Sequence, residues 1–394
     1  MKLNRSGALD GTRVIDASRV LAGPFAGQLL GDHGAEVIKV ESFDGDDTRR
    51  FGPPFVEGTA PYFMGLNRNK ENLALDLSGD AGRSLLFDLL EKADVFIENF
   101  KLSTWKKWGV EDISEICARF PKLVHCRVSG FGETGEFGGL PGYDAAVQAI
   151  SGLMAVNGPP EESACRIGIP IVDSCTGMNA CMGILLALLE CKTSGRGQYV
   201  EATLFDTALS MLHPHASNVL NGGKAIRTGN GHPNIVPYDL FPTATVPLFL
   251  AVGNDRQFGR LCAELGAPSL SENALYLTNG SRVVNRDSLR EHLVHLLADR
   301  DGIALFDRLM GLGVPCAPVL TVEEALALDH TRTREMTVEL DGYTGPGMAI
   351  KLGRTPGAVR LPPAPIGLHS RDVLKRFGYS DDDIDGLIEA KVVS

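Results

Sequence analysis

Short apolar runs alternate with amphipathic, helix-length segments through the first third of the chain. The runs that predict strands are TRVIDA, AEVIKVE, NLALDL, DVFIEN and KLVHCRVS. Between several of them lie helix-length segments such as FAGQLLGDHG and AGRSLLFDLLEKA, the second of which follows Ser78 and Asp80 as candidate caps. This strand–helix–strand alternation predicts a parallel, doubly wound α/β sheet of the Rossmann-like class. The segment QYVEATLFDTALSMLHPHA repeats the pattern near residues 200–215.

The pattern changes between residues 216 and 247, where Gly, Pro and Asn are frequent, as in a linker or an ordered loop. A second strand–helix unit begins at LFLAVGNDRQFGRLCAEL. The chain ends with strand-like VEL and MAIK and then two helices, the last capped by Ser380. We therefore expect a large α/β domain built from both chain ends around a smaller α+β domain. The expected boundaries are 1–200 for the N-terminal part of the large domain, 201–224 for a linker, 225–322 for the small domain, and 323–394 for a second linker and the C-terminal part of the large domain.

Composition narrows the function classes. The net charge of -11, with no block dense in Lys and Arg, argues against a general nucleic-acid binder. The eight cysteines form no CxxC pair and have no zinc-like spacing with histidine, so we expect buried thiols and no metal site. The N-terminus lacks a signal-peptide pattern, and no uncharged apolar run reaches membrane-spanning length. We expect a cytoplasmic protein with no membrane or nucleic-acid partner.

Two familiar sites are poorly supported by their motifs. VIDASRVLAGPFAGQLLGDHGAEVIKVE is a βαβ pattern without the G-x-G-x-x-G fingerprint, and Pro24 stands in its turn, so we do not expect a nicotinamide site. The turn could instead be a simple strand–helix connection, or its amides could face a phosphate or adenine. His213, His215 and His232 have no acid at ligand spacing, and we interpret them as loop or packing residues rather than metal ligands.

The segment IPIVDSCTGMNACMGILLALLE places Asp173 where an apolar run, interpreted as a buried strand, leads into a buried helix. Asp173 could simply cap that helix, although Ser174 or Thr176 could do the same. A carboxylate at the carboxyl end of a strand also lies where open α/β sheets bind ligands. The helix N-terminus would keep it ionised, and small neighbours such as Gly177 and Ala180 leave room for a bulky substrate.

Several stretches together resemble one family, the class III CoA transferases, which include formyl-CoA and carnitine CoA transferases. The matching stretches are VIDASRVLAGPFAGQLLGDHGAEVIKVE, GDDTR, LNRNKENLALDL, VFIENFKLSTWKKWG, VSGFGETG, GYDAAVQAISGLM, DSCTGMNA, TSGRGQYVEATLFD, GVPCAPV and GYSDDDI, in the family's order from the first strand to the C-terminus. The resemblance implies an interlocked homodimer with each site built from both subunits. It also implies an acyl-CoA and a carboxylic acid as substrates, with no permanently bound cofactor.

The resemblance implies that Asp173 is the nucleophile. Its carboxylate would attack the thioester carbonyl to give a mixed anhydride and expel CoA thiolate, which returns to form an aspartyl-CoA thioester. The acceptor acid then repeats these steps in reverse. No proton is abstracted, so no neighbouring base is needed. An ionised carboxylate, exclusion of water and donors for the oxyanion are needed instead.

The resemblance also implies a set of CoA contacts. Lys101, Lys107 and Arg49 would offset the phosphate charges, although a single lysine is more often a solvated surface charge. The full set of CoA contacts is Val20, Leu21 and Ala22 in the first turn, Leu75 near adenine, Asn99, Phe100 and Lys101 in the NF-x segment, Lys107, and Tyr143 and Asp144 at the thioester end.

Two departures from the formyl-CoA transferases bear on the substrate. Leu21 stands where that branch has Gln, and GNGHPNIVPYDLF replaces its glycine run, so we do not expect oxalate as the acceptor. The chain looks nearer to the succinate–hydroxymethylglutarate CoA transferase branch. This favours succinyl-CoA as donor and a branched or hydroxylated dicarboxylate as acceptor. Arg19 and His232 are candidates to hold the acceptor's distal carboxylate, because that group needs a cation.

Two alternatives remain open on the sequence. An α-methylacyl-CoA racemase shares the fold and the matching Asp, but it needs two opposed acid/base groups. The racemases have GHD where this chain has GYD, and tyrosine is a poor replacement for that histidine as a base near neutral pH. A non-catalytic CoA-binding paralogue is the second alternative, and the retention of Asp173 among small residues disfavours it.

Overall fold

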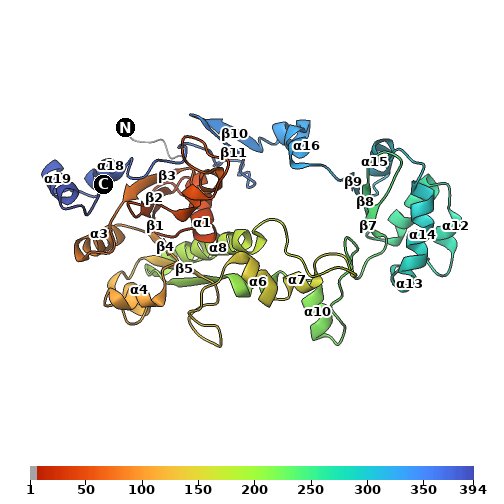
Figure 1. Ribbon diagram of the computed structural model, residues 1–394, viewed down its shortest axis with the longest axis horizontal. Coiled ribbons are helices and arrows are strands. Elements are labelled where there is room, and N and C mark those ends of the chain that lie inside the picture. Colours follow the sequence, from red (N-terminus) through yellow and green to blue (C-terminus); the bar gives the residue numbers. More distant parts are fainter. Residues whose placement is uncertain (1–6) are drawn as a thin grey trace. The chain divides into compact units, whose positions relative to one another are not determined.

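The computed structural model describes residues 7–394 and divides into two compact units (Figure 1). Unit 1 contains the chain up to Gln148 together with Gly168–Ser210 and Leu328–Ser394, and unit 2 contains Ala149–Ile167 and Met211–Ala327. The larger unit thus draws on both chain ends. This division differs from the boundaries expected above, because residues 149–167 and the Gly-rich segment after residue 211 belong by their packing to unit 2.

A six-stranded parallel sheet forms the centre of unit 1 (Figure 1). The strand order β3-β2-β1-β4-β5-β6 places the sequence switch between β1 and β4, as in a Rossmann-like sheet. The five runs expected as strands in the first third of the chain, and the run near residue 200, form these six strands, which confirms the parallel α/β prediction. Their bounds are β1 Arg13–Asp16, β2 Glu36–Glu41, β3 Lys70–Ala74, β4 Val95–Glu98, β5 Val124–Ser129 and β6 Tyr199–Thr203.

Helices from the middle and the end of the chain share one apolar core with this sheet. The core joins Leu86, Trp105 and Ile116 to Leu374 and Ile384 from the C-terminal helices. A capping box between Ser380 and Asp383 starts the last helix, as expected. The caps expected for α3 are wrong, because Gly79 is its N-cap and the Ser78 N–H donates to Asp76 in the preceding turn. The helices are α3 Asp80–Leu90, α4 Leu102–Lys107, α5 Ser114–Arg119, α18 Ser370–Arg376 and α19 Asp381–Glu389.

Two further helices of unit 1, α1 (Ala22–Asp32) and α8 (Ile171–Ser194), pack against each other. Their contact is closest at Gly177, where an added Cβ would lie 2.7 Å from the Ala22 carbonyl oxygen. An added Cβ at Gly183, two turns further along α8, would lie 2.7 Å from a methyl group of Val200 in β6. Glycine therefore lets α8 approach both α1 and the sheet closely.

The strand expected before Asp173 is absent. Pro170 is the N-cap of α8, and Ile171, Val172 and Asp173 form its first turn. A short apolar run is compatible with either a strand or a buried helix, and Pro170 has no N–H to join a strand ladder, whereas it is well tolerated at a helix start. The nucleophile candidate thus lies inside a helix rather than at a strand's exit.

The 24 residues of α8 are long and apolar enough to cross a membrane by length and composition alone, although the sequence suggested that no run was long enough. The helix nevertheless carries Asp173 in its first turn, and one side of it packs in the interior of unit 1. The other side is exposed. It presents Met178, Met182, Leu185, Leu186 and Leu189, which are 41% to 66% exposed.

Unit 2 has its own antiparallel sheet and its own core. Strands β7 (Tyr238–Phe241), β8 (Leu248–Ala251) and β9 (Cys316–Pro318) pair in that order. Their apolar residues pack with helices α11 Asp255–Glu264, α13 Asn279–Val284, α14 Arg286–Leu297 and α15 Gly302–Gly311. The unit is an α+β unit, as the sequence suggested for the smaller part.

A small hairpin lies in the C-terminal part of unit 1. The expected strand VEL is confirmed within β10 (Thr337–Leu340), but its partner is β11 (Tyr343–Pro346) and not MAIK. The turn at Asp341 and Gly342, both with positive φ, brings residues 343–346 back at once beside β10. The remaining elements are η1 Asp47–Arg50, α2 Pro61–Met64, α6 Asp144–Ile150, α7 Leu153–Val156, α9 Leu204–Ser210, α10 His215–Leu220, α12 Ser269–Glu272, α16 Val322–Ala327 and α17 Asp329–Thr333.

The approach of α8 to α1 gives the first prediction. We expect Gly177→Ala to lower the free energy of unfolding by about 2–3 kcal/mol, because its Cβ would contact backbone that must move as a whole. The control is Gly259→Ala in α11, where an added Cβ would meet nothing within 4 Å. That variant should gain about 0.5–1 kcal/mol from helix propensity. Urea unfolding followed by circular dichroism measures both, and equal stability of the two variants would contradict the close packing.

Candidate active site

A cavity of about 410 Å³ opens at the carboxyl ends of β1, β4 and β5 in unit 1. Residues 19–22 follow β1 into it, residues 99–102 follow β4, and residues 127–130 lie at the end of β5. The cavity brings together nine of the residues that the sequence singled out: Arg19, Val20, Leu21, Ala22, Asn99, Phe100, Lys101, Tyr143 and Asp173.

The Asp173 carboxyl is mostly buried in the first turn of α8 beside a second carboxylate, that of Asp144. The Asp144 Oδ2 atom accepts hydrogen bonds from the backbone N–H of Val172 at 2.8 Å and of Asp173 at 3.1 Å. The Gln148 side chain donates to the other Asp144 oxygen at 2.6 Å. Asp144 therefore occupies the donors at the start of α8.

Burial, and to a smaller extent the Asp144 charge, raise the pKa of Asp173 to about 7. The expectation that the helix N-terminus would keep Asp173 fully ionised is wrong. The reason is that desolvation outweighs the helix dipole and the free N–H groups already bind Asp144. Above pH 7 the Asp173 carboxylate is poorly solvated, and such an anion is a reactive nucleophile.

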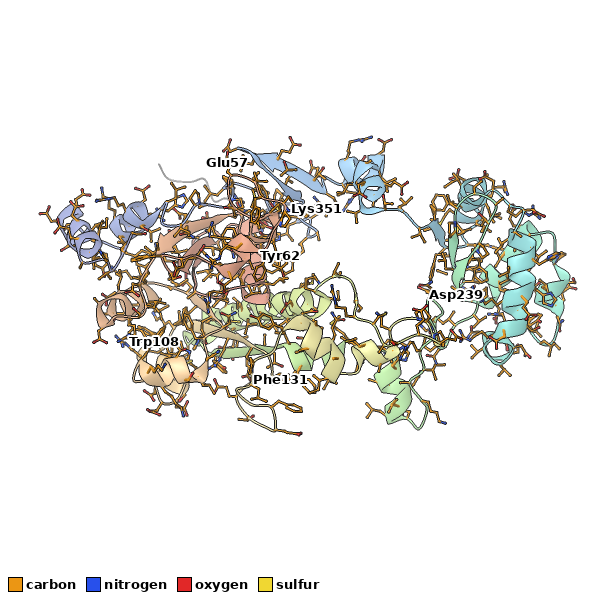
Figure 2. All side chains as sticks on the ribbon, viewed as in Figure 1. Glu57, Tyr62, Trp108, Phe131, Asp239 and Lys351 are labelled. Carbon is orange, nitrogen blue, oxygen red and sulfur yellow. The ribbon has the colours of Figure 1, made fainter. Side chains whose placement is uncertain are left out.

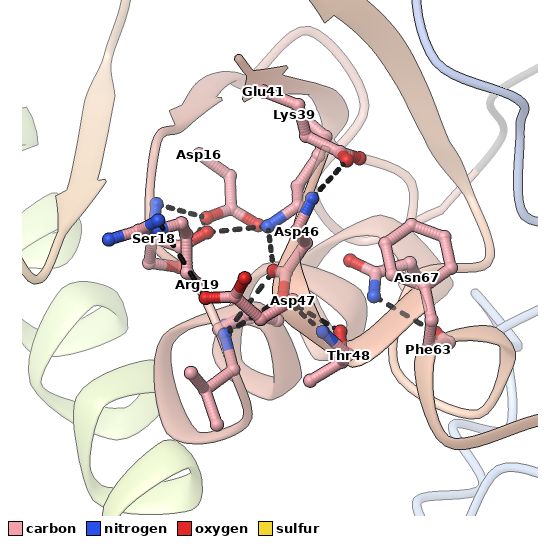
Figure 3. Close-up of polar contacts among 12 residues, drawn as sticks. Asp16, Ser18, Arg19, Lys39, Glu41, Asp46, Asp47, Thr48, Phe63 and Asn67 are labelled. Carbon is pink, nitrogen blue, oxygen red and sulfur yellow. Dashed lines mark hydrogen bonds and ion pairs between the residues drawn. The ribbon is translucent and has the colours of Figure 1, made fainter. Parts of the chain in front are cut away.

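Buried ion pairs underlie the first turn of the cavity, residues 18–22 (Figure 3). Asp16 contacts Lys70 at 2.8 Å, Lys39 contacts Asp46 at 3.1 Å, and all four side chains are at most 1% exposed. Although burial opposes it, the Lys39 charge holds the pKa of the Asp46 carboxyl below its usual value. The Asp46 carboxylate also accepts the N–H groups of Val20 and Thr48. These pairs connect the turn to η1, whose first residue Asp47 lines the cavity.

The second wall, the Asn99–Lys101 segment, is also held by side chains. Glu98 accepts the Phe100 N–H at 2.6 Å, and Arg127 donates to the Phe100 carbonyl at 3.0 Å. The Asn99 amide bonds the backbone of Arg19, with the Arg19 N–H donating to Oδ1 at 3.1 Å and Nδ2 donating to the Arg19 carbonyl at 2.9 Å. Asn99 therefore joins the two walls.

Four predicted CoA residues lie outside the cavity lining. Asp144 is one of them, since its carboxylate binds the first N–H groups of α8, and its contact with CoA stays a prediction. Leu75 is 1% exposed and packs in the core, where it bridges to Val393. Lys107 ends α4 and is exposed. The Arg49 guanidinium binds Glu41 through two bonds of 2.8 Å and is buried, so its charge is already paired. The proposed contacts of Leu75 and Lys107 with CoA stay predictions.

His232 belongs to unit 2. Its Nδ1 accepts the Asn234 N–H at 3.0 Å, and its ring lies 5.3 Å from that of Tyr238. Burial lowers the pKa of His232, and Arg286, His215 and His213 lower it further. Its proposed contact with a substrate carboxylate stays a prediction. Across residues 7–394, no group of three or more His, Cys, Asp or Glu side chains has the arrangement of a metal site.

A second, smaller cavity of about 230 Å³ lies next to the start of α8, and sequence reasoning did not identify it. It is mainly apolar and is lined by Leu21, Phe25, Tyr62, Gly65, Leu66, Pro170 and Ser174, so it shares Leu21 with the larger cavity and flanks Asp173. Burial raises the pKa of the Tyr62 hydroxyl, labelled in Figure 2, and the nearby Asp173 charge raises it further. In the sequence, the aromatic pair Tyr62 and Phe63 in APYFM was the one signal that could have indicated this cavity.

Arg127 and Asp47 also line the larger cavity without having been predicted. The close backbone approach of Gly130 and Gly142, where an added Cβ at either would lie 2.7 Å from the other's Cα, shapes the same wall. The signal for Gly130 was present in VSGFGETG, but that stretch contributed to the family resemblance without a role being assigned to it.

The chain resembles known proteins over the length of both units. The sequence profile of CoA-transferase family III matches residues 9–370. The succinate–glutarate CoA-transferase of Agrobacterium fabrum is 38% identical over 384 residues, which cover 94% of this chain and 96% of that protein. The human succinyl-CoA:glutarate CoA-transferase is 35% identical, with 99% and 91% covered. Among solved structures, a CAIB/BAIF family protein from Brucella suis has a TM-score of 0.83 and 36% identity, covering 94% of this chain and all of that one.

The Asp144–Asp173 pair predicts a measurable titration. We expect Asp173 to be half ionised near pH 7 and Asp144→Asn to move that midpoint to lower pH, because a neutral amide no longer repels the Asp173 anion. Burial remains, so the midpoint should stay above that of a solvated aspartate. The infrared carboxyl band, taken as a difference from Asp173→Asn, measures the midpoint. The exposed Asp206→Asn serves as control, and an unchanged midpoint in Asp144→Asn would contradict the coupling.

Proposed function

Because the chain belongs to CoA-transferase family III, we propose that it moves CoA from succinyl-CoA to a dicarboxylic acid through covalent intermediates on Asp173. The observation that carries the proposal is the buried Asp173 carboxyl, which lines the cavity formed by the turn after β1 and the segment after β4. The chain is a class III CoA-transferase by its relatives; the nucleophile and the substrates are what is proposed here.

The chemistry follows from a carboxylate that needs no base. One Asp173 oxygen attacks the thioester carbonyl carbon, the C–S bond breaks, and CoA leaves as its thiolate. The thiolate then attacks the Asp173 carbonyl of the mixed anhydride and releases the donor acid as a carboxylate. The acceptor carboxylate attacks the resulting aspartyl thioester, and the thiolate finally attacks the acceptor's carbonyl, which frees Asp173. No proton is transferred in any step.

The small cavity beside Asp173 suits the carbon chain of the acyl group. Its lining of Leu21, Phe25 and Leu66 is apolar, and the Tyr62 hydroxyl is a neutral donor near the reacting carboxylate. Since water hydrolyses an anhydride, an apolar wall at this place favours transfer to the acceptor.

The donor and acceptor are proposed from two sources. The sequence favours succinyl-CoA with a branched or hydroxylated dicarboxylate, and the names of two relatives add glutarate, which is unbranched. Arg19 lines the cavity with its side chain 58% exposed, and it is the proposed partner of a substrate carboxylate. His232 of unit 2 is proposed for the same purpose.

We propose further that two copies of the chain form an interlocked homodimer. The exposed apolar side of α8 supports it, because Met178, Met182, Leu185, Leu186 and Leu189 recur at helical spacing and leave a continuous apolar surface in contact with water. A two-fold interface places the same surface of both copies together, and an apolar stripe is complementary to itself.

The proposed function predicts CoA transfer that depends on Asp173. With succinyl-CoA and a panel of glutarate, hydroxymethylglutarate, oxalate and valerate, we expect new acyl-CoA for the first two acids by mass spectrometry. Asp173→Ala should lose at least about 10³-fold in rate, since it removes the attacking atoms. The exposed Asp206→Ala is the matched control.

Hydroxylamine cleaves an aspartyl thioester, releasing CoA and leaving a hydroxamate on residue 173, and detection of that hydroxamate by mass spectrometry tests the intermediate independently of the rate. Full activity of Asp173→Ala would refute the mechanism. Loss of an α-deuterium from 2-methylacyl-CoA, without any transfer to an acid, would point instead to the racemase alternative.

The homodimer predicts a particle of twice the 42.2 kDa chain mass in light scattering, and this mass should persist on dilution. Leu186→Glu should reduce the dimer fraction, because it buries a charge within the interface. Val284→Glu, at an exposed apolar residue of unit 2, is the control. A monomeric wild type would contradict the proposal, and binding of the α8 stripe to phosphatidylcholine vesicles would assign it to a lipid surface.

A further inference from the structure

We infer that Lys39, Asp46 and Asn99 are positioning residues that fix the backbone on both sides of Arg19 and thereby hold its guanidinium in place for a substrate carboxylate. The inference rests on the proposed function, because that function supplies the carboxylate. It adds three residues that act through Arg19 rather than on the substrate.

The two peptide groups that flank Arg19 have all four of their polar atoms bonded to side chains. In the first peptide, the Ser18 carbonyl accepts from Lys39 Nζ, and the Arg19 N–H donates to Asn99 Oδ1 at 3.1 Å. In the second, the Arg19 carbonyl accepts from Asn99 Nδ2 at 2.9 Å, and the Val20 N–H donates to Asp46 Oδ2 at 3.2 Å. Figure 3 draws Ser18, Arg19, Lys39 and Asp46 together with the bonds among them. Neither peptide can rotate without breaking two of these bonds.

The backbone conformation held in this way is an unfavourable one. Val20 has φ +73°, and among residues 7–394 it is the one β-branched residue with positive φ. A β-branched side chain in the left-handed region is strained and persists only where the surroundings determine it. Backbone strain of this kind concentrates at functional sites.

The side chains that hold the turn are themselves costly to place there. Lys39 and Asp46 are 1% and 0% exposed, and a buried ion pair seldom adds stability over an apolar pair of the same size. Such a pair is therefore better explained by the backbone geometry that it defines. Here that geometry concerns one residue, Arg19, whose own side chain is exposed in the cavity.

The Arg19 guanidinium remains available for a ligand. Within residues 7–394 its one acidic partner is Asp47, at 3.9 Å, and both side chains are more than half exposed, so the pair is weak. Asp47 lies closer to Arg50, at 3.0 Å. Arg19 thus combines a rigid backbone with an unsatisfied planar cation, which suits recognition of a carboxylate through two parallel bonds.

Asn99 gives the sharpest test, because the family resemblance assigns it to CoA whereas the structure bonds its amide to Arg19. A double-mutant cycle with Arg19→Ala and Asn99→Ala separates the two roles. We expect each single variant to raise KM for the dicarboxylate acceptor by about tenfold with a much smaller effect on KM for succinyl-CoA. In the Arg19→Ala background, Asn99→Ala should change the acceptor KM less than about twofold.

Asn285→Ala, which removes side-chain bonds to the backbone of unit 2, controls for general loosening and should leave the acceptor KM unchanged. Multiplicative effects of the two substitutions would overturn the inference, because Asn99 would then act on a substrate directly. A rise confined to KM for succinyl-CoA would overturn the assignment of Arg19 to the acid.

The same cycle measured as the Kd of succinate by calorimetry does not depend on turnover. If the wild type transfers no CoA, the proposed function fails, and the cycle in Kd still decides the role of Asn99. If transfer is normal and Asp173-dependent but the cycle is additive, the inference alone fails. Since Asn99 is only half-buried, its variant should fold. Thermal unfolding of each variant checks that it does.

Discussion

The site depends on how closely α8 approaches α1. Gly177 permits contact with the Ala22 carbonyl, and Asp173 stands one helical turn before that glycine. Asp173 and the first turn of the cavity are therefore placed by a single helix–helix contact. The Asp144 carboxylate completes the arrangement, because it binds the free N–H groups at the start of α8 and fixes where the helix begins. Packing sets the position of Asp173, and burial sets its reactivity.

Much of the fold could be predicted from the sequence, because parallel strands buried on both faces appear as β-branched runs at regular intervals. All six strands of the parallel sheet in unit 1 were found in this way, and so was the strand–helix unit at β8 and α11 of unit 2, whereas β7 lies in the stretch that was interpreted as a linker or loop. The stretch before Asp173 was assigned wrongly, since four apolar residues fit a strand and a buried helix equally. The pKa of Asp173 could not be predicted from the sequence either. That value follows from desolvation and from Asp144, whose proximity 29 residues away depends on the tertiary structure.

The buried ion pairs were missed although the sequence contains a signal for them. Lys39 interrupts the apolar run EVIKVE, and Lys70 and Asn72 stand in a strand whose residues are all buried. A charge inside a fully buried strand must have a partner, but the partner cannot be named without the fold. Asp46 lies only seven residues from Lys39, whereas Asp16 lies 54 residues from Lys70. The family resemblance identified most of the cavity residues, and the structure added the buried ion pairs that hold the first turn of the cavity in place.

The Asn99 amide has a mechanical consequence. In sheets with this strand order, the connections after β1 and β4 run in opposite directions, and a crevice opens between them. Here the Asn99 side chain joins the segment after β4 to the turn after β1 through two hydrogen bonds, so the two segments are coupled in any movement. The cavity is also lined by Gly132 and Gly139, both with positive φ, and Gly135 between them has positive φ as well, so the backbone of this loop has a conformational freedom that the joined segments lack.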